Sequence, residues 1–88
     1  MNEDQIRTAV LESISDIAPE ADVSTLDPDR TFAFELDLDS MDVLNVAMGV
    51  EERTGVAILE RDYARVGTVN SLVAYVSTAL ATPSETVS

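Results

Sequence analysis

Residues 35–55 read ELDLDSMDVLNVAMGVEERTG and contain the signals for both ends of one helix. Asp39 is a favourable N-cap residue, which places Ser40 at the first helical position and Asp42 at the third, where it completes an acidic variant of the capping box. Gly55 follows, and glycine commonly ends a helix at this position. We therefore predict a helix that begins at Asp39 and ends before Gly55, with a serine at the junction of loop and helix.

The predicted helix has an apolar side and a more polar side. Met41, Leu44, Ala47, Met48 and Val50 make up the apolar side, and Asp42, Asn45, Gly49 and Glu52 share the polar one. We expect the apolar side to face the core. Methionine at helical spacing is usually a core residue, but Met41 and Met48 could alternatively line an adaptable groove.

Two further amphipathic helices are predicted, one on either side of this segment. The first spans residues 2–18 and the second spans residues 68–81. Their apolar residues recur at steps of three and four: Ile6, Val10, Ile14 and Ile17 in the first, and Val69, Leu72, Val73, Val76 and Leu80 in the second. Asn2 and Gln5 are spaced for a capping box, and Pro19 disfavours a helical conformation at the residue before it. The sequence thus predicts three long helices.

The connections between these helices differ in character. Residues 19–38 contain two prolines and many polar residues, and we predict a long loop that Leu26, Phe32 and Leu36 anchor to the core. Residues 56–59 form a short apolar run, but no second run exists to pair with it as a strand. We assign this run to a buried connector.

The predicted fold is all-α, a small three- to four-helix bundle with a long loop between the first and second helices. Residues 60–65 are expected to form one short helical turn, with Tyr63 packing inward. At 88 residues and 45% hydrophobic composition, the chain has room for a single core. We expect one domain over residues 1–81, followed by a disordered tail at residues 82–88.

The chain is strongly acidic, with 17 Asp and Glu against 5 Lys and Arg and a net charge of -12. Such a field disfavours binding to nucleic acid and to anionic membrane surfaces, and it favours partner proteins with basic patches. The first ten residues, MNEDQIRTAV, lack the basic and apolar regions of a signal peptide, and no apolar run reaches membrane-spanning length. We therefore expect a cytoplasmic protein without membrane insertion.

The residue types exclude most familiar catalytic and metal sites. The chain has no cysteine and no histidine, so thiolate nucleophiles, Ser-His-Asp relays and zinc sites built from these ligands cannot form. The carboxylates around Asp37 do not follow the calcium-binding loop pattern, because counting from Asp37 places Asp42 where glycine is required and Met48 where glutamate is required. The residues predict no catalytic centre and no metal site.

Ser40 stands out on chemical grounds. At the first helical position its hydroxyl lies beside free backbone N–H groups and the positive end of the helix dipole, which would stabilise an attached phosphate. The residues alone leave two interpretations open: Ser40 carries a phosphoester, or Asp39, Ser40 and Asp42 only cap the helix.

The segment LDLDSMD, residues 36–42, resembles the Asp-Ser-Leu motif of acyl carrier proteins, and the resemblance covers nearly the whole chain. Phe32 and Leu36 stand where this family has its loop anchors. Further positions at matching separations from the serine are Leu44, Met48, Val50, Glu51, Glu52, Ile58, Tyr63, Thr68 and Val69.

The resemblance implies a carrier that is not an enzyme and acts as a monomer. A phosphopantetheinyl transferase, using coenzyme A and magnesium, would attach 4'-phosphopantetheine to Ser40, and the thiol of this arm would hold an acyl group as a thioester for fatty acid, polyketide or related biosynthesis. Asp39 would be the motif acid that assists the transferase. The second helix would dock acyl-loading and acyl-processing enzymes with basic patches, through Asp42, Glu51, Glu52, Met41 and Met48.

Three departures from the family pattern indicate a specialised, free-standing member. Asp37 stands where the family usually has glycine, so we expect the turn before the serine to differ in shape. Met41 replaces the usual leucine, a volume-conserving change that is similar to some D-alanyl carrier proteins. Asn45, Gly49 and Arg53 reduce the negative charge of the second helix, and we expect a correspondingly different set of partner enzymes.

Three alternatives to the acyl carrier remain. One is an aminoacyl or peptidyl carrier, whose motif more often has glycines before the serine. Another is a D-alanyl carrier protein. The third is an acidic protein-interaction module without a prosthetic group, in which Ser40 is only a helix cap.

Overall fold

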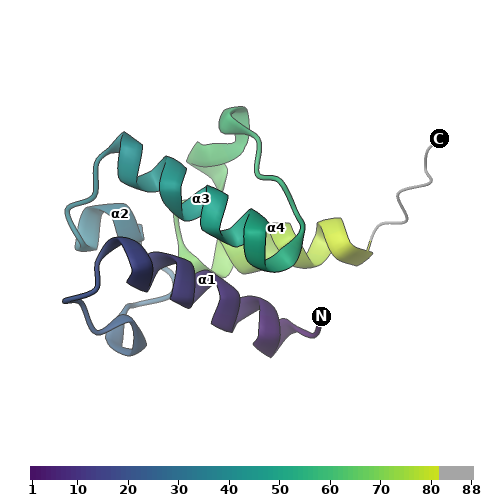
Figure 1. Ribbon diagram of the computed structural model, residues 1–88, viewed down its shortest axis with the longest axis horizontal. Coiled ribbons are helices and arrows are strands. Elements are labelled where there is room, and N and C mark those ends of the chain that lie inside the picture. Colours follow the sequence, from purple (N-terminus) through teal and green to yellow (C-terminus); the bar gives the residue numbers. More distant parts are fainter. Residues whose placement is uncertain (82–88) are drawn as a thin grey trace.

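Three long helices form the frame of the structure, a computed structural model that describes residues 1–81 (Figure 1). They are α1 (Glu3–Ile17), α3 (Ser40–Thr54) and α4 (Val69–Ala81), and the connections contain the short helix α2 (Phe32–Glu35) and the 3-10 helices η1 (Val23–Thr25) and η2 (Glu60–Arg65). Within residues 1–81 there is no strand, so the predicted all-α bundle is confirmed. The tail predicted at residues 82–88 lies outside the described part of the chain.

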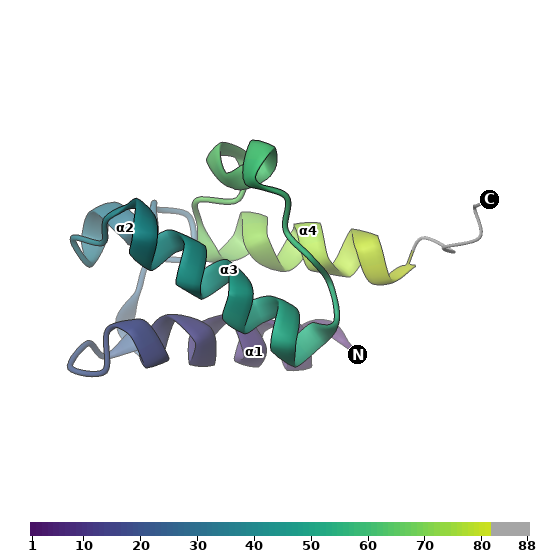
Figure 2. The same ribbon diagram turned by 45° about the horizontal axis from the view of Figure 1, so that its top comes forward.

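The helices are arranged around α3. Figures 1 and 2 show α1 and η2 on opposite sides of α3, and α2 beside the end of α3 at which that helix begins. Helix α1 packs against both α3 and α4. This arrangement leaves one side of α3 uncovered along its length, between α2 at one end and the connector to η2 at the other.

Local capping fixes the helix ends close to the predicted residues. At the start of α1, the Gln5 backbone N–H donates to Asn2 Oδ1 (2.8 Å) and the Asn2 N–H donates to Gln5 Oε1 (2.9 Å), which confirms the predicted capping box. Helix α3 ends at Gly55, which adopts a left-handed conformation with φ of 79° and donates its N–H to the Glu51 carbonyl. Thr68 accepts a hydrogen bond from the Ser71 N–H and so caps α4.

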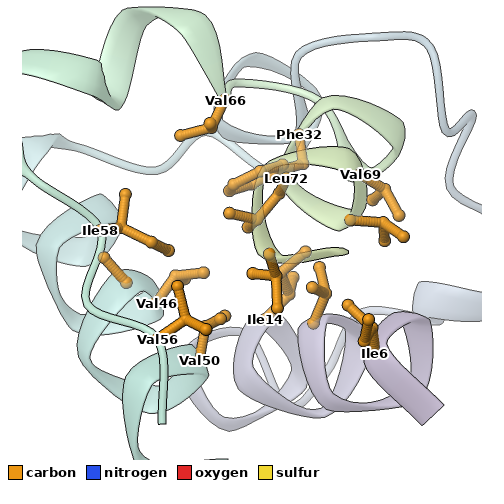
Figure 3. Close-up of a cluster of buried hydrophobic side chains, with 14 residues drawn as sticks. Ile6, Ile14, Phe32, Val46, Val50, Val56, Ile58, Val66, Val69 and Leu72 are labelled. Carbon is orange, nitrogen blue, oxygen red and sulfur yellow. The ribbon is translucent and has the colours of Figure 1, made fainter. Parts of the chain in front are cut away.

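The core is a single apolar cluster that α1, α3 and α4 enclose together with the residues that link them (Figure 3). Its members are Ile6, Val10, Ile14, Phe32, Val46, Ala47, Val50, Val56, Ile58, Val66, Val69, Leu72, Val73 and Val76. Val56 and Ile58 of the predicted buried connector are buried, but Ala57 and Leu59 of the same run are exposed. Leu80, which was expected on the apolar face of α4, is also exposed.

The prediction of which side of α3 faces the core was wrong in part. Ala47 and Val50 are buried as expected, but Met41, Leu44 and Met48 are exposed, and Val46 takes their place inside. Apolar residues surround most of this helix, so periodicity offers two stripes with the same spacing. The short branched side chains allow the neighbouring helices to approach, and the long methionines remain outside.

Gly49 and Arg53, which were predicted to reduce the negative charge of this helix, lie at the contact between α3 and α1. A Cβ atom at Gly49 would lie 3.1 Å from Ser13 Oγ, so only glycine fits there without a shift. The Arg53 guanidinium contacts Asp16 at 2.7 Å and Glu12 at 3.4 Å, and the pKa of Arg53 is raised above its ordinary value chiefly by the hydrogen bond to Asp16.

The long connection between α1 and α3 is more structured than predicted, since it contains η1 and α2. Phe32 is 3% exposed and anchors the loop to the core as expected, and its N–H donates to the Gly67 carbonyl at 3.0 Å. The Asn70 N–H donates to the Pro28 carbonyl at 3.0 Å, and the Asn70 side chain donates to Asp29 at 2.7 Å. Backbone bonds to the start of α4 therefore reinforce the apolar anchors.

Asp37 adopts a left-handed backbone conformation with φ of 57°, in the turn that joins α2 to α3. The turn is closed by the Leu38 N–H, which donates to the Ala33 carbonyl at 2.8 Å. Glycine enters this conformation without steric cost, whereas other residues do so rarely, with aspartate among the better tolerated. Asp37 thus replaces the family's usual glycine but takes a backbone conformation typical of glycine. The turn before Ser40 therefore does not need a shape different from the family's.

Helix η2 is tied to α4 by a hydrogen bond, which the Tyr75 hydroxyl donates to Asp62 Oδ2 at 2.9 Å. This bond and partial burial raise the pKa of Tyr75 above its ordinary value. Arg65 pairs with the same carboxylate at 3.2 Å. Tyr63 packs against the core from η2, as predicted.

We predict a measurable coupling between Asp16 and Arg53. In a double-mutant cycle with Asp16→Asn and Arg53→Met, urea unfolding should give a coupling free energy of about 0.5–1 kcal/mol at low salt, because the pair is largely solvent-exposed. The coupling should shrink at about 1 M salt through screening. The matched control is Glu51→Gln with Arg53→Met, since residues two apart on a helix do not face each other. Zero Asp16–Arg53 coupling at low salt would contradict the ion pair.

The left-handed conformation of Asp37 predicts an ordered pair of stabilities. In urea unfolding, the free energy of unfolding of Asp37→Gly should exceed that of Asp37→Ala by about 1 kcal/mol, because the left-handed conformation has a steric cost for alanine and none for glycine. Among residues 1–81, Asp37 is the sole non-glycine residue with positive φ. The same two substitutions at Glu20 should therefore favour alanine, and an equal preference at both positions would disprove the assignment.

Candidate functional site

Ser40 is the first residue of α3, and its side chain is exposed to solvent. Asp39 is the N-cap, and its Oδ1 accepts from the Asp42 N–H at 2.9 Å. Asp42 Oδ2 accepts in turn from the Asp39 N–H at 3.3 Å. The acidic capping box predicted from the sequence is therefore confirmed, and it holds Ser40 at the end of the helix.

The surroundings of Ser40 fit a phosphoester. The first-turn N–H groups of α3 have no carbonyl partner within the helix, and the helix dipole places partial positive charge at this end. Asp37 and Asp39 bring negative charge close to Ser40. One carboxylate oxygen of Asp39 is already engaged in the capping hydrogen bond. The exposed hydroxyl leaves room for a bulky substituent on its solvent side.

A ridge of exposed apolar side chains runs along α3 from Ser40. Met41 is 61% exposed, Leu44 is 37% exposed and Met48 is 51% exposed, and these three residues form what we call the apolar ridge. Their spacing of three and four residues places them on one side of the helix. Large exposed apolar patches on a small monomeric domain usually mark interaction surfaces.

The acidic residues predicted for docking fall into two places. Asp42 lies next to Ser40 and is engaged in the capping box, whereas Glu51 and Glu52 are exposed near the far end of α3. At 1.5 Å per residue, Glu51 lies about 16 Å along the helix from Ser40. The structure thus brings Asp39, Ser40 and Asp42 together and sets Glu51 and Glu52 apart from them.

Two hollows adjoin this region. The Ser40 hollow, about 240 Å³, is open to solvent and lined by Ser40, Met41, Leu44, Glu60 and Tyr63. The core cavity, about 10 Å³, is lined by Phe32, Val43, Val46, Ala47, Ile58, Tyr63, Val66 and Leu72. In Figure 3, Val46, Ile58 and Leu72 lie around this central space.

Glu60 was not predicted to be part of the site, and Tyr63 was predicted only to pack inward. Both residues come from η2, about twenty positions beyond the serine, so local patterns could not place them beside it. Phe34 was also missed as a surface feature, although it is 88% exposed on α2. The sequence did contain a signal for an exposed Phe34, since it is an aromatic residue within a loop of acidic and polar residues.

Among residues 1–81, no group of three or more Asp or Glu side chains converges in a way that could hold a metal ion. Over the same residues, no helix is long and apolar enough to cross a membrane.

Comparisons with known proteins agree with the geometry around Ser40. The family described as "Phosphopantetheine attachment site" matches residues 8–76. The chain is 30% identical to the acyl carrier protein of Exiguobacterium sp. over 80 residues, which cover 91% of this chain and 100% of that protein. It is 31% identical to the acyl carrier protein of Acidothermus cellulolyticus over 81 residues, which cover 90% of this chain and 93% of that protein.

A third relative is longer than this chain. The meromycolate extension acyl carrier protein of Mycobacterium tuberculosis is 33% identical over 67 residues, which cover 76% of this chain and 55% of that protein, so the match spans about half of the relative's length. No solved structure matches the chain significantly. The family match over residues 8–76 and the full-length match to the Exiguobacterium protein show that the chain belongs to the acyl carrier proteins, a family with a phosphopantetheine attachment site.

Proposed function

We propose that the chain carries acyl groups as thioesters on a 4'-phosphopantetheine arm attached to Ser40. The observation that carries this proposal is the exposed Ser40 hydroxyl at the first position of α3, inside the segment that matches the family. The arm supplies a thiol, which the chain itself lacks because it has no cysteine. The function is transport of the bound group between enzymes, and the chain contributes no catalytic residue.

The attachment reaction follows from the chemistry of a serine hydroxyl and coenzyme A. Ser40 Oγ attacks the phosphorus that bears the pantetheine group, a phosphoester bond forms, and the P–O bond of the pyrophosphate breaks. Adenosine 3',5'-bisphosphate leaves, and the hydroxyl proton passes to a base of the transferase. Within this chain, the helix dipole stabilises the phosphate and the Asp39 cap holds Ser40 outward.

The partner enzymes that we propose are a phosphopantetheinyl transferase and the enzymes that load and process the acyl group. The apolar ridge gives a partner enzyme an apolar surface to bury, and Glu51 and Glu52 add negative charge to the same docking surface. With a net charge of -12, the chain is attracted over a distance to basic surfaces. Arg53 does not oppose this attraction on the exposed side, because it pairs with α1.

The cargo that we propose is a fatty acyl or related acyl group. The mycobacterial relative is named for meromycolate extension, and the two full-length relatives are named as acyl carrier proteins. These names support a role in fatty acid, polyketide or related biosynthesis, and we propose that the chain acts in the cytoplasm.

Attachment to Ser40 is tested by intact mass. Incubation of the purified chain with a broad-specificity phosphopantetheinyl transferase, magnesium and coenzyme A should add one phosphopantetheine to the wild type and none to Ser40→Ala. The matched control is Ser24→Ala, an exposed serine on η1, which should be modified like the wild type. Modification of Ser40→Ala, or none of the wild type, would refute the proposal.

Docking along α3 is tested by charge reversal. Glu51→Lys combined with Glu52→Lys should lower the transferase kcat/KM by about tenfold at low salt, with a smaller effect at high salt, because steering by exposed charges is screened. The matched control reverses Glu3 and Glu20, which changes the net charge equally at exposed positions outside α3. Equal losses in both double variants would show that only net charge matters, and circular dichroism should confirm that both fold.

A further inference from the structure

Tyr63 is the residue that separates the two hollows beside Ser40. Its side chain lines the Ser40 hollow together with Met41 and Leu44, and it also lines the core cavity together with Val46 and Ile58. Among the residues that line either hollow, Tyr63 is the one common to both.

The core cavity is too small to accept cargo as it stands. Its volume of about 10 Å³ is no more than a single water molecule needs to enter a cavity, about 10–15 Å³ by the same measure. The side chains that line the cavity are apolar, apart from the hydroxyl group of Tyr63. Burial of an alkyl chain there would be favourable if the cavity were large enough. An acyl chain is therefore excluded by lack of space, and the ring of Tyr63 occupies part of the space that it would need.

Helix η2 is held so that Tyr63 stays in this position. On one side, Asp62 of η2 accepts a hydrogen bond from the Tyr75 hydroxyl of α4 at 2.9 Å. On the other side, Ile58 and Val66, which precede and follow η2, are buried in the core. These attachments on both sides of Tyr63 oppose a movement of η2 away from α3.

We infer that Tyr63 is a specificity-determining residue that keeps the alkyl part of the cargo out of the core, so that the cargo is carried in the Ser40 hollow and along the apolar ridge. This inference rests on the proposed attachment at Ser40. Partner enzymes then reach the cargo without first extracting it from the bundle. The apolar ridge gives such a cargo an external surface on which to lie.

The experiment compares acyl groups of different length on the same carrier. A broad-specificity transferase loads acetyl-, butyryl- and octanoyl-phosphopantetheine from the corresponding coenzyme A esters, and intact mass verifies each product. Thermal unfolding then gives Tm, and methyl NMR reports the chemical shifts of Val46 and Leu72 in the core. In the wild type, Tm should change by no more than about 1 °C from acetyl to octanoyl, and the core methyl shifts should stay constant.

Tyr63→Ala should reverse this behaviour. Without the ring, the octanoyl chain gains access to the apolar cavity, and Tm should rise by about 5 °C or more over the acetyl form because buried methylene groups stabilise the folded state. The Val46 and Leu72 methyl resonances should shift with chain length. Tyr63→Leu should behave in the same direction, and it replaces Tyr63→Ala if that variant does not fold.

The matched control is Ile6→Val, which loosens the core on the α1 side without lining either hollow. It should show no dependence of Tm on chain length. A wild type whose Tm and core shifts already depend on chain length, or folded Tyr63 variants that behave like the wild type, would overturn the inference. Failure of the wild type to load would instead refute the proposed attachment, and the two failures are thus distinguished by intact mass.

Discussion

The reciprocal hydrogen bonds between Asp39 and Asp42 fix the residue at which α3 begins. If α3 began one turn earlier, Ser40 would lie inside the helix, away from the free N–H groups and the positive dipole end of the first turn. The position of Ser40 therefore depends on this pair of carboxylates, whereas the contact with α1 sets which side of the helix, with Val46 and Val50, faces the core.

The helix ends could be predicted from the sequence because the interactions that set them are local. The Asn2 and Asp39 caps and the Gly55 stop each involve residues within four positions of one another. The inward side of α3 could not be predicted in full, because two apolar stripes share the same period. The choice between them is made by α1, where Ser13 lies against Gly49.

The same distinction separates what could be predicted of the site from what could not. Ser40 and its flanking acids form a continuous segment, so they could be singled out from residue types and spacing. The hollow beside Ser40 requires Glu60 and Tyr63, which reach it only through the path of the chain around η2. The ion pairs of Arg53 depend likewise on a helix distant in sequence, and no charge count could assign that arginine to the contact with α1.

The bonds that tie the loop before α3 to the start of α4 have a consequence for the order of folding. Asn70 contacts Asp29 across 41 positions of sequence, and Phe32 bonds to Gly67 across a similar span. Helices form quickly from neighbouring residues, whereas contacts between distant residues must wait for loop closure. The loop that leads to Ser40 gains these anchors only once the last helix is present, so a growing or truncated chain would present Ser40, the proposed attachment residue, on a loop that is not yet anchored.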